Sequence, residues 1–456
     1  MERVLRDWAD RRVAVIGMGR SGMAAARVLV ELGARVFLSD SRKSEELGDL
    51  LEQVPDGVEV ETGGHSASCA AADVIVVSPG VPKSLAVLQA AEADGVELIG
   101  EIELAWRLAE APIVAITGTN GKTTTTTLVG EILREAGWEA PVGGNIGVPL
   151  VSLVRQKSHA LVAEISSFQL ETADQFRPHV GVFINFSDDH LNRHGTREAY
   201  FNLKKQLFAR QHDGDYAVLN ADDPAVAALA PEVAAQVILF SRQGSLPRGV
   251  CVEGDVVCWN RSSGPLPLYP VTDIHLRGEH NVENCLAATA AALALGVSPP
   301  IIARAVAAFR GVEHRIEPVR TLAGVQWFND SKGTNYDSTL KAITSFAEPL
   351  VLIAGGRDKG GAISPLIDAI AKRVAHTVLL GEAAPYFERV LRAAGYHSIT
   401  LAADLPGAVQ TARDLAPAGG VVLFSPACTS FDMFNNFEER GAAFKALVSA
   451  LEEVPA

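Results

Sequence analysis

The sequence predicts an α/β protein built from three successive units. At roughly 150 residues per domain, a chain of 456 residues holds about three domains. Short apolar runs that suit buried strands alternate with amphipathic stretches that suit helices, a pattern typical of parallel sheets covered on both faces. The pattern restarts twice, which places the domains at residues 1–110, 111–311 and 312–456.

The first unit begins with a strand, a glycine turn and a helix. Strands are expected at residues 13–16 and 35–39, another apolar run lies around 72–80 and is closed by Pro-Gly, and Gly33 ends the first helix.

The glycine turn carries a phosphate-binding pattern. Gly17, Gly19 and Gly22 form G-x-G-x-x-G, and Asp40 follows the second strand. Such a turn lets the backbone approach a phosphate closely, with a helix N-terminus facing the anion. By itself the motif is typical of NAD binding. Another nucleotide diphosphate, or a turn that only packs helix on strand, remains an alternative.

The second unit repeats the strand–turn–helix order. A strand near residues 113–117 leads through a turn into a helix over 122–136, and a buried Ala-rich helix is expected around 285–297. The other expected strands lie at residues 160–166, 180–186, 216–220 and 237–240, followed by a small antiparallel region in 250–275.

The turn of the second unit, Gly118–Thr124 (GTNGKTT), predicts ATP or GTP binding. Backbone N–H groups of such a loop converge on phosphates, Lys122 adds positive charge, and the Thr123 hydroxyl suits Mg²⁺. Ile116 stands where a strict P-loop has its first glycine, so this loop is a shortened variant. Five consecutive threonines (123–127) are poor helix formers, which disfavours a purely structural purpose.

Polar side chains follow two further strands of this unit. Glu164 ends one apolar strand, and Asp188–His190 follows another. Carboxyl ends of parallel strands meet at one edge of a sheet, and oxygen ligands with an imidazole suit Mg²⁺ or Mn²⁺. His190 and His194 have a spacing that could suit zinc, but without an H-E-x-x-H motif we favour magnesium.

Two more features of this unit are ambiguous from residues alone. Lys204, in Tyr200-x-x-x-Lys204, suits a solvated helix face, because a protonated lysine cannot ligate a metal. Asn281 and Asn284 open the Ala-rich helix, where asparagine either caps the helix or binds an adenine edge.

The third unit has polar clusters after its expected strands at 325–330, 350–356, 376–381 and 421–427. We expect these clusters to line a ligand-binding crevice, in which Arg315 and Lys332 would stabilise phosphate charge. Three of them end strands, namely Asp330–Asn335, Gly355–Lys359 and Ser425–Gly441, and a further polar pair, His314–Arg315, follows the boundary of the unit.

Composition limits the partners. With 40 basic against 54 acidic residues the net charge is −14, which argues against broad binding of nucleic acid or anionic membranes. Five cysteines without a C-x-x-C pair fit a reducing cytoplasm. The N-terminus lacks an apolar signal core, and no run is long enough to span a bilayer. We therefore expect a cytoplasmic protein without membrane insertion.

Taken together, the motifs resemble the Mur ligase family in kind and in order. They are GTNGKTT, AEISSFQLE, DDHLNRH, YFNLKK, GEHNVENCLAA, GVEHRIE, NDSKGTN and SPACTSFDMFNNFEERG. The phosphate loop is shared by the superfamily, including folylpolyglutamate synthases. The last stretch, with GMGRSGMA and PVGGNIG, is similar to the D-glutamate-adding branch, and the D-N-P-R motif of the diaminopimelate-adding branch is absent.

The resemblance implies an α/β protein with three domains: an N-terminal Rossmann-like domain, a central P-loop ATPase-type parallel sheet and a C-terminal Rossmann-like domain. The carboxylate of UDP-N-acetylmuramoyl-L-alanine would attack the γ-phosphate of ATP, giving an acyl phosphate and ADP. The amine of D-glutamate would then displace phosphate. The resemblance also replaces NAD with a uridine diphosphate as the expected ligand of the glycine turn. It implies that the protein is a monomer that acts in the cytoplasmic stage of peptidoglycan precursor synthesis.

The resemblance also implies residue roles. The catalytic residues would be Lys122, His190, Lys204 and Lys332. ATP would contact Gly118, Thr119, Asn120, Gly121, Lys122, Thr123, Thr124, Asn281, Asn284, Arg315 and Asp330. The UDP substrate would contact Gly19, Arg20, Ser21, Ser41, Arg42, Asn145 and His190. D-Glutamate would contact Thr334, Lys359, Ser430, Phe431 and Phe437.

For the metal, the resemblance implies two Mg²⁺ sites, with Mn²⁺ as an alternative ion. Thr123 and Glu164 would hold the first ion and His190 the second. Lys204 would carry a carbamate formed with CO₂, and Lys205 is the alternative if the alignment shifts by one residue.

Two hypotheses from other classes compete with the ligase. A nicotinamide-dependent dehydrogenase would explain the first unit and leave the phosphate loop unexplained. A non-enzymatic nucleotide switch would hydrolyse ATP without forming an amide.

Overall fold

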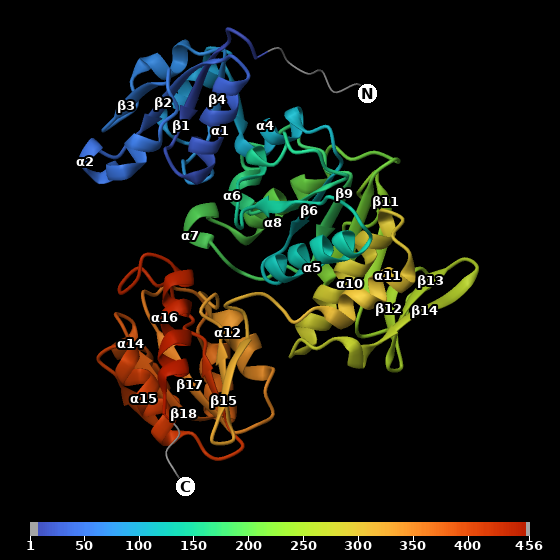
Figure 1. Ribbon diagram of the computed structural model, residues 1–456, viewed down its shortest axis with the longest axis vertical. Helices are drawn as coiled ribbons and strands as arrows, with labels where there is room; N and C mark the ends of the chain where they lie inside the picture. Colours follow the sequence, from blue (N-terminus) through green and yellow to red (C-terminus); the bar gives the residue numbers. More distant parts are fainter. Residues whose placement is uncertain (1–7, 453–456) are drawn as a thin grey trace. The chain divides into compact units, whose positions relative to one another are not determined.

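The computed structural model describes residues 8–452, apart from the side chains of residues 191 and 192 (Figure 1). It contains three separate sheets, each with helices against it, which confirms the predicted α/β class. Among the described residues, no helix combines the length and apolar character that crossing a bilayer requires.

The first sheet is wholly parallel, with the strand order β3-β2-β1-β4-β5. Its strands and first helix are β1 (Arg12–Ile16), α1 (Arg20–Glu31), β2 (Arg35–Asp40), β3 (Glu59–Thr62), β4 (Val74–Val77) and β5 (Glu97–Gly100). The chain turns back past β1 to add β4, so the order reverses between β1 and β4. Open α/β sheets bind ligands at the carboxyl ends of strands that flank such a reversal.

The second sheet has the order β14-β13-β12-β11-β10-β9-β6-β8-β7. Strands β6, β8 and β9 are buried along their whole length, as expected for central parallel strands. The predicted antiparallel region is present as β12–β14. The strands are β6 (Ile113–Thr117), β7 (Val142–Gly144), β8 (Leu161–Glu164), β9 (Val180–Phe183), β10 (Tyr216–Asn220), β11 (Gln236–Ser241), β12 (Gly249–Glu253), β13 (Val256–Arg261) and β14 (Gly264–Pro270).

Three helices of this region are expected from the sequence, α5 (Lys122–Glu135), α8 (Arg197–Lys205) and α10 (Glu279–Ala294). The structure adds α6 (Ser167–Leu170), α7 (Leu191–His194) and α11 (Pro299–Ala308), and α4 (Glu101–Leu108) connects the first sheet to the second. The Ala-rich stretch lies in α10 and is buried, as predicted. Small alanine side chains allow that helix to pack closely in the interior.

The third sheet has the order β15-β16-β20-β17-β18-β19, with β15 antiparallel to β16 and the other pairs parallel. Its strands are β15 (Glu317–Leu322), β16 (Val325–Asn329), β17 (Leu350–Gly355), β18 (Val374–Leu380), β19 (Ile399–Leu401) and β20 (Val421–Phe424). Its helices are α12 (Tyr336–Thr344), α13 (Ser364–Arg373), α14 (Ala384–Ala393), α15 (Leu405–Leu415) and α16 (Phe437–Ala450). The loops that follow β16, β17 and β20 carry the predicted polar clusters.

The chain divides into two compact units. The first holds the described residues up to Ile274 together with Glu283–Phe309, and the second holds His275–Val282 and the residues from Arg310 onward. The first unit thus contains two sheets. The predicted domain limits near residues 110 and 312 fall between consecutive sheets and stay a prediction.

Candidate active site

The glycine turn of the first sheet brings helix α1 unusually close to strand β1. A Cβ atom on Gly22 would lie 1.8 Å from the carbonyl oxygen of Gly17, and Gly17 itself has φ +99°. Gly19, in contrast, has an ordinary φ of −80° and no atom within 4 Å of a Cβ. The three glycines therefore have different roles. Gly17 and Gly22 allow the close packing of the turn, whereas a side chain at position 19 would extend into open space.

Asp40, at the end of β2, is fully engaged by the protein. Its carboxylate accepts hydrogen bonds from the backbone N–H of Met18 at 2.6 Å and from Arg42 at Nε and Nη2. Burial opposes ionisation, yet the hydrogen bonds from Arg42 and Met18 outweigh it and lower the pKa of Asp40 to about 2. Asp40 thus holds Arg42 in place, and its oxygens are not free for the ribose hydroxyls that an NAD protein binds at this position.

A cavity of about 440 Å³ opens in front of this turn. It collects six of the seven residues predicted to bind the UDP substrate, namely Gly19, Arg20, Ser21, Ser41, Arg42 and Asn145. Arg20 also donates to the carbonyl oxygen of Gly147, at 3.3 Å. His190, the seventh predicted residue, is not among the cavity's lining residues.

The cavity also contains groups that the sequence analysis missed. Ser78, which follows strand β4, donates through its hydroxyl to the carbonyl oxygen of Gly17 at 3.0 Å, and Gln169 lines the opposite side. The sequence does contain a signal for Ser78, because this residue directly follows the apolar residues VIVV, which form the strand that pairs with β1.

The phosphate loop lies between β6 and α5, as predicted. Gly118 and Gly121 have φ of +156° and +84°, which only glycine adopts readily. The Lys122 ammonium donates to the carbonyl oxygens of Gly118 and Thr119, at 2.9 and 2.8 Å. It is therefore held over the loop, where it can meet an incoming phosphate.

Asn185 braces the loop from the end of β9, a role the sequence analysis missed. Its Oδ1 accepts from the backbone N–H of Asn120 at 2.9 Å, and its Nδ2 donates to the carbonyl oxygen of Asn120 at 3.1 Å. Its only sequence signal is its place after an apolar strand. Asn284 also packs on the loop, since its Oδ1 lies 2.1 Å from where a Cβ of Gly121 would be.

Thr123, in the first turn of α5, contacts Glu164, the last residue of β8. This is the meeting at the carboxyl edge of the sheet that the sequence predicts. The Thr123 hydroxyl donates to Glu164 Oε2 at 2.7 Å, and Asn145 donates to Glu164 Oε1 at 2.9 Å. Both Thr123 and Glu164 are buried. Because the Thr123 proton points to the carboxylate, the oxygen lone pairs of Thr123 remain available to a hard cation. This oxygen set fits Mg²⁺.

The structure separates Lys204 from Lys205. Lys204 is buried, and its ammonium nitrogen donates to the carbonyl oxygen of Gly118 at 2.8 Å. Burial, and next the charge of Lys122, depress its pKa far below the usual lysine value, against the opposing charges of Asp189 and Glu164. Lys205 is partly exposed and pairs with Glu232. The prediction of a solvated lysine face is therefore wrong for Lys204 and fits Lys205.

His190 and His194 have different surroundings. His190 has φ +53°, is partly exposed, and its ring lies 4.9 Å from that of Phe168. His194 is buried, with Nε2 3.0 Å from the Ser167 hydroxyl and Nδ1 3.5 Å from Glu171. Protein groups thus meet both nitrogens of His194, which disfavours the zinc pair.

In the second unit, the polar loops of the third sheet are joined to one another. Asp330 accepts from the Ser425 hydroxyl at 2.6 Å, and the Lys332 ammonium lies 5.2 Å from the centre of the Phe437 ring. Burial raises the pKa of Asp330 to about 6, against the opposing charge of Arg315.

The other predicted D-glutamate contacts stand in these same loops. They are Thr334 after β16, Lys359 after β17, and Ser430, Phe431 and Phe437 after β20. Phe431 is 61% exposed, whereas Ser430 is buried.

Asn281 also belongs to the second unit. Its Nδ2 donates to the carbonyl oxygen of Arg277 at 2.7 Å, a bond that ties the first turn of α10 to the residues before it and differs from an N-cap, in which the side chain accepts from backbone N–H groups.

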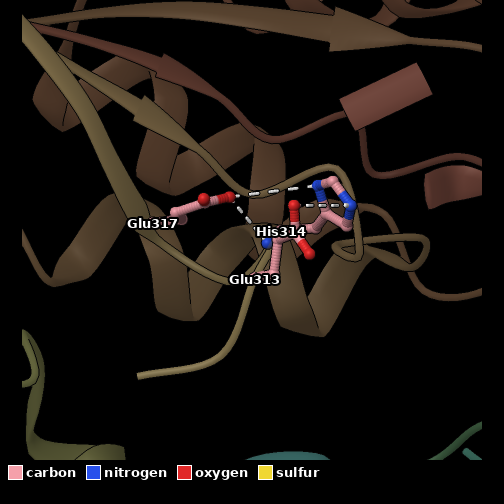
Figure 2. A group of neighbouring side chains, drawn as sticks. All are labelled: Glu313, His314 and Glu317. Atoms are coloured by element: carbon pink, nitrogen blue, oxygen red, sulfur yellow. Dashed lines mark hydrogen bonds and ion pairs between the residues drawn. The ribbon is translucent and has the colours of Figure 1, made fainter. Parts of the chain in front are cut away.

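Figure 2 shows Glu313, His314 and Glu317, the group in the described residues whose ligand atoms are close enough for a metal. A protein cation already meets this group, because the Lys445 ammonium pairs with Glu313 and, at 3.0 Å, with Glu317. Asn329 Nδ2 lies 2.9 Å from His314 Nδ1. The group therefore fastens α16 to the strand β15 region.

Three family models match the chain along its length. The Mur ligase middle domain covers residues 116–292, the Mur ligase MurD-like N-terminal domain covers 11–100, and the Mur ligase glutamate ligase domain covers 314–428. A relative from Pelotomaculum thermopropionicum is 45% identical over 454 residues, 99% of this chain and 100% of the relative. One from Geobacter metallireducens is 48% identical over 448 residues, 97% and 98% of the two chains. Both relatives are named UDP-N-acetylmuramoylalanine–D-glutamate ligase.

The chain belongs to the Mur ligase family. It is an ATP-dependent ligase of peptidoglycan precursor synthesis, which confirms the function class predicted from the motifs.

Solved structures agree with the fold of this Mur ligase. UDP-N-acetylmuramate–alanine ligase from Thermotoga maritima gives a TM-score of 0.59 at 19% identity, covering 96% of this chain and 99% of its own. The MurF ligase of the same organism, solved in complex with ADP, gives 0.60 at 16% identity, covering 98% and 97%. A three-domain α/β layout is thus common to these ligases.

Proposed function

We propose that this Mur ligase joins D-glutamate to UDP-N-acetylmuramoyl-L-alanine, using ATP, as a monomer in the cytoplasm. The observation that carries the proposal is the near-complete alignment with relatives named for that reaction, at 45–48% identity. The cavity beside the glycine turn, with Arg20 and Arg42, suits an anionic diphosphate.

The reaction brings together three anions, so positive charge and hydrogen-bond donors must offset their repulsion. A carboxylate oxygen of the UDP substrate forms a bond to the γ-phosphorus of ATP while the bond to ADP breaks. The D-glutamate amine then forms a bond to the acyl carbon, phosphate leaves with the electron pair of the broken C–O bond, and the amine loses a proton.

Residues of the phosphate loop orient the nucleotide in this proposal. The Lys122 ammonium offers charge to the phosphates, and the loop N–H groups of Gly118–Thr124 face them. Among residues 8–452 the buried hydroxyls of Thr124, Thr125 and Thr126 have no hydrogen-bond partner, and that of Thr124, which belongs to the loop, would donate to a bound phosphate.

The magnesium requirement fits residues of the first unit. Thr123 and Glu164 would hold one Mg²⁺, and His190 with the Lys204 carbamate would hold a second, Mn²⁺ being an alternative. The ion supplies charge stabilisation to the transferring phosphoryl group. Asn284 would contact the nucleotide, being already against Gly121.

Residues of the second unit complete the proposal. Asn281, Arg315 and Asp330 would contact ATP, and Lys332 would neutralise charge on the transferred phosphoryl group. D-Glutamate would be held by Thr334, Lys359, Ser430, Phe431 and Phe437, the two phenylalanines acting through backbone groups.

The deciding experiment offers UDP-N-acetylmuramoyl-L-alanine and ATP with a panel of D- and L-amino acids and follows ADP release and the product mass. We expect amino-acid-dependent ADP release with D-glutamate and an adduct heavier by one glutamate residue. ADP release with a different amino acid, or without any product, would contradict the proposal.

Gly19 and Gly22 are expected to respond differently to alanine. Gly22→Ala should lower the free energy of unfolding by about 1–3 kcal/mol, because its Cβ would overlap the Gly17 carbonyl. Gly19→Ala should leave stability within about 0.5 kcal/mol of wild type while raising the KM for the UDP substrate, because its Cβ enters the cavity. Denaturant unfolding and steady-state kinetics measure the two effects. An equal loss of stability in both variants would contradict the different roles assigned to Gly19 and Gly22.

A further inference from the structure

The guanidinium of Arg440, in helix α16, lies inside the second unit beneath two loops that carry candidate D-glutamate contacts. The residue is 1% exposed. Nε donates to the Ser331 hydroxyl at 3.0 Å, and Nη2 donates to the carbonyl oxygens of Ser331 at 2.8 Å and Cys428 at 3.1 Å. Nη1 donates to the carbonyl oxygens of Cys428 at 3.2 Å and Thr429 at 3.1 Å.

Within the described residues Arg440 makes no ion pair, and its partners are carbonyl and hydroxyl oxygens. Burying a cation without a carboxylate is unfavourable unless its hydrogen bonds are satisfied. Here the planar fork of the guanidinium matches two oxygen atoms on each of the two loops, those of Ser331 on one and of Cys428 and Thr429 on the other, a geometry that lysine cannot reproduce. This side chain therefore fixes backbone atoms of both loops in one arrangement.

Those backbone atoms adjoin the proposed amino-acid contacts. Ser331 directly precedes Lys332, and Thr429 directly precedes Ser430. The Ser331 hydroxyl in turn donates to the carbonyl oxygen of Phe437 at 2.8 Å. Hydrogen bonds thus connect Arg440 to the backbone beside Lys332 and Ser430 and, through the Ser331 hydroxyl, to Phe437.

We propose that Arg440 is a positioning residue for the incoming amino acid, holding the Ser331–Lys332 and Cys428–Ser430 segments at the spacing that D-glutamate requires. The inference rests on the proposed function and deepens it. Misplacing binding groups by about 1 Å is enough to cost on the order of 10²-fold in efficiency.

The test compares Arg440→Lys and Ser331→Ala with Arg320→Met. Arg320 makes a matched control because it donates to the carbonyl oxygens of Val448, Ser449 and Leu451, at the other end of the same helix. For each folded variant, KM is measured separately for D-glutamate, ATP and UDP-N-acetylmuramoyl-L-alanine, together with Tm and the ratio of D- to L-glutamate turnover.

We expect Arg440→Lys and Ser331→Ala to raise the KM for D-glutamate about tenfold or more, to lower the D-to-L ratio, and to change the other two KM values less than twofold. Arg320→Met should lower Tm and leave all three KM values near wild type. An unchanged KM for D-glutamate, an equal rise in all three values, or the same rise in Arg320→Met would overturn the proposal.

The same variants decide two further cases. If Arg440→Lys does not fold, Ser331→Ala decides, since it removes only the shared hydroxyl. If the wild-type enzyme uses another amino acid, the proposed function fails, and the same KM comparison with that amino acid decides the role of Arg440.

Discussion

Replacing Lys122 with alanine is expected to abolish ATP turnover, with kcat falling by about 10³-fold or more. The ammonium is held by the carbonyl oxygens of Gly118 and Thr119, on the loop whose glycines adopt left-handed conformations. Since both reactants are anions, removing this charge raises the barrier to their approach. ADP release in a coupled assay, under saturating substrates, measures the effect.

The control for this variant is Lys205→Ala, which removes a partly exposed lysine paired with Glu232. It should retain turnover within about twofold, since surface changes of this kind have small effects. Both variants should unfold at similar denaturant concentrations. Substantial turnover by a folded Lys122→Ala enzyme would remove the phosphate-loop assignment.

Replacing Lys204 with alanine is expected to lose activity by about 10³-fold, and short carboxylates such as acetate or formate should restore part of it. The physical reason begins with burial: Lys204 is 1% exposed, and its nitrogen meets the carbonyl oxygen of Gly118, the Thr117 hydroxyl at 3.4 Å and the face of the Tyr200 ring. With its pKa depressed by that burial, and next by Lys122, a larger share of the side chain is the neutral amine that attacks CO₂. Adding CO₂ to the amine and losing one proton gives the anionic carbamate.

The carbamate leads to two further measurements. Wild-type activity should fall in CO₂-free buffer and return with bicarbonate, and ¹³C-labelled bicarbonate should give a carbamate carbon resonance that is absent in Lys204→Ala. Lys205→Ala again serves as the matched control. Carboxylate rescue of Lys205→Ala instead, or full activity of Lys204→Ala, would show that the modified residue is not Lys204.

The sequence by itself determined the features whose geometry is set within one short segment. The phosphate loop is such a feature, because its glycines, Lys122 and Thr123 follow one another between a strand and a helix. The glycine turn after β1 is another, and the alternation of apolar runs was sufficient for the α/β class. Local sterics and periodicity decide these structures, so contiguous residues carry the signal.

Other properties were decided only by the tertiary structure. Lys204 and Lys205 are adjacent and chemically identical, yet one is buried among charges from α5, β8 and the loop before α7, and the other is partly exposed. Asn185, Ser78 and Arg440 gave at most weak signals, since each acts through atoms many residues away. Burial, charge neighbourhood and the supports of a binding loop depend on segments that meet only after folding, and a one-dimensional pattern does not contain those distances.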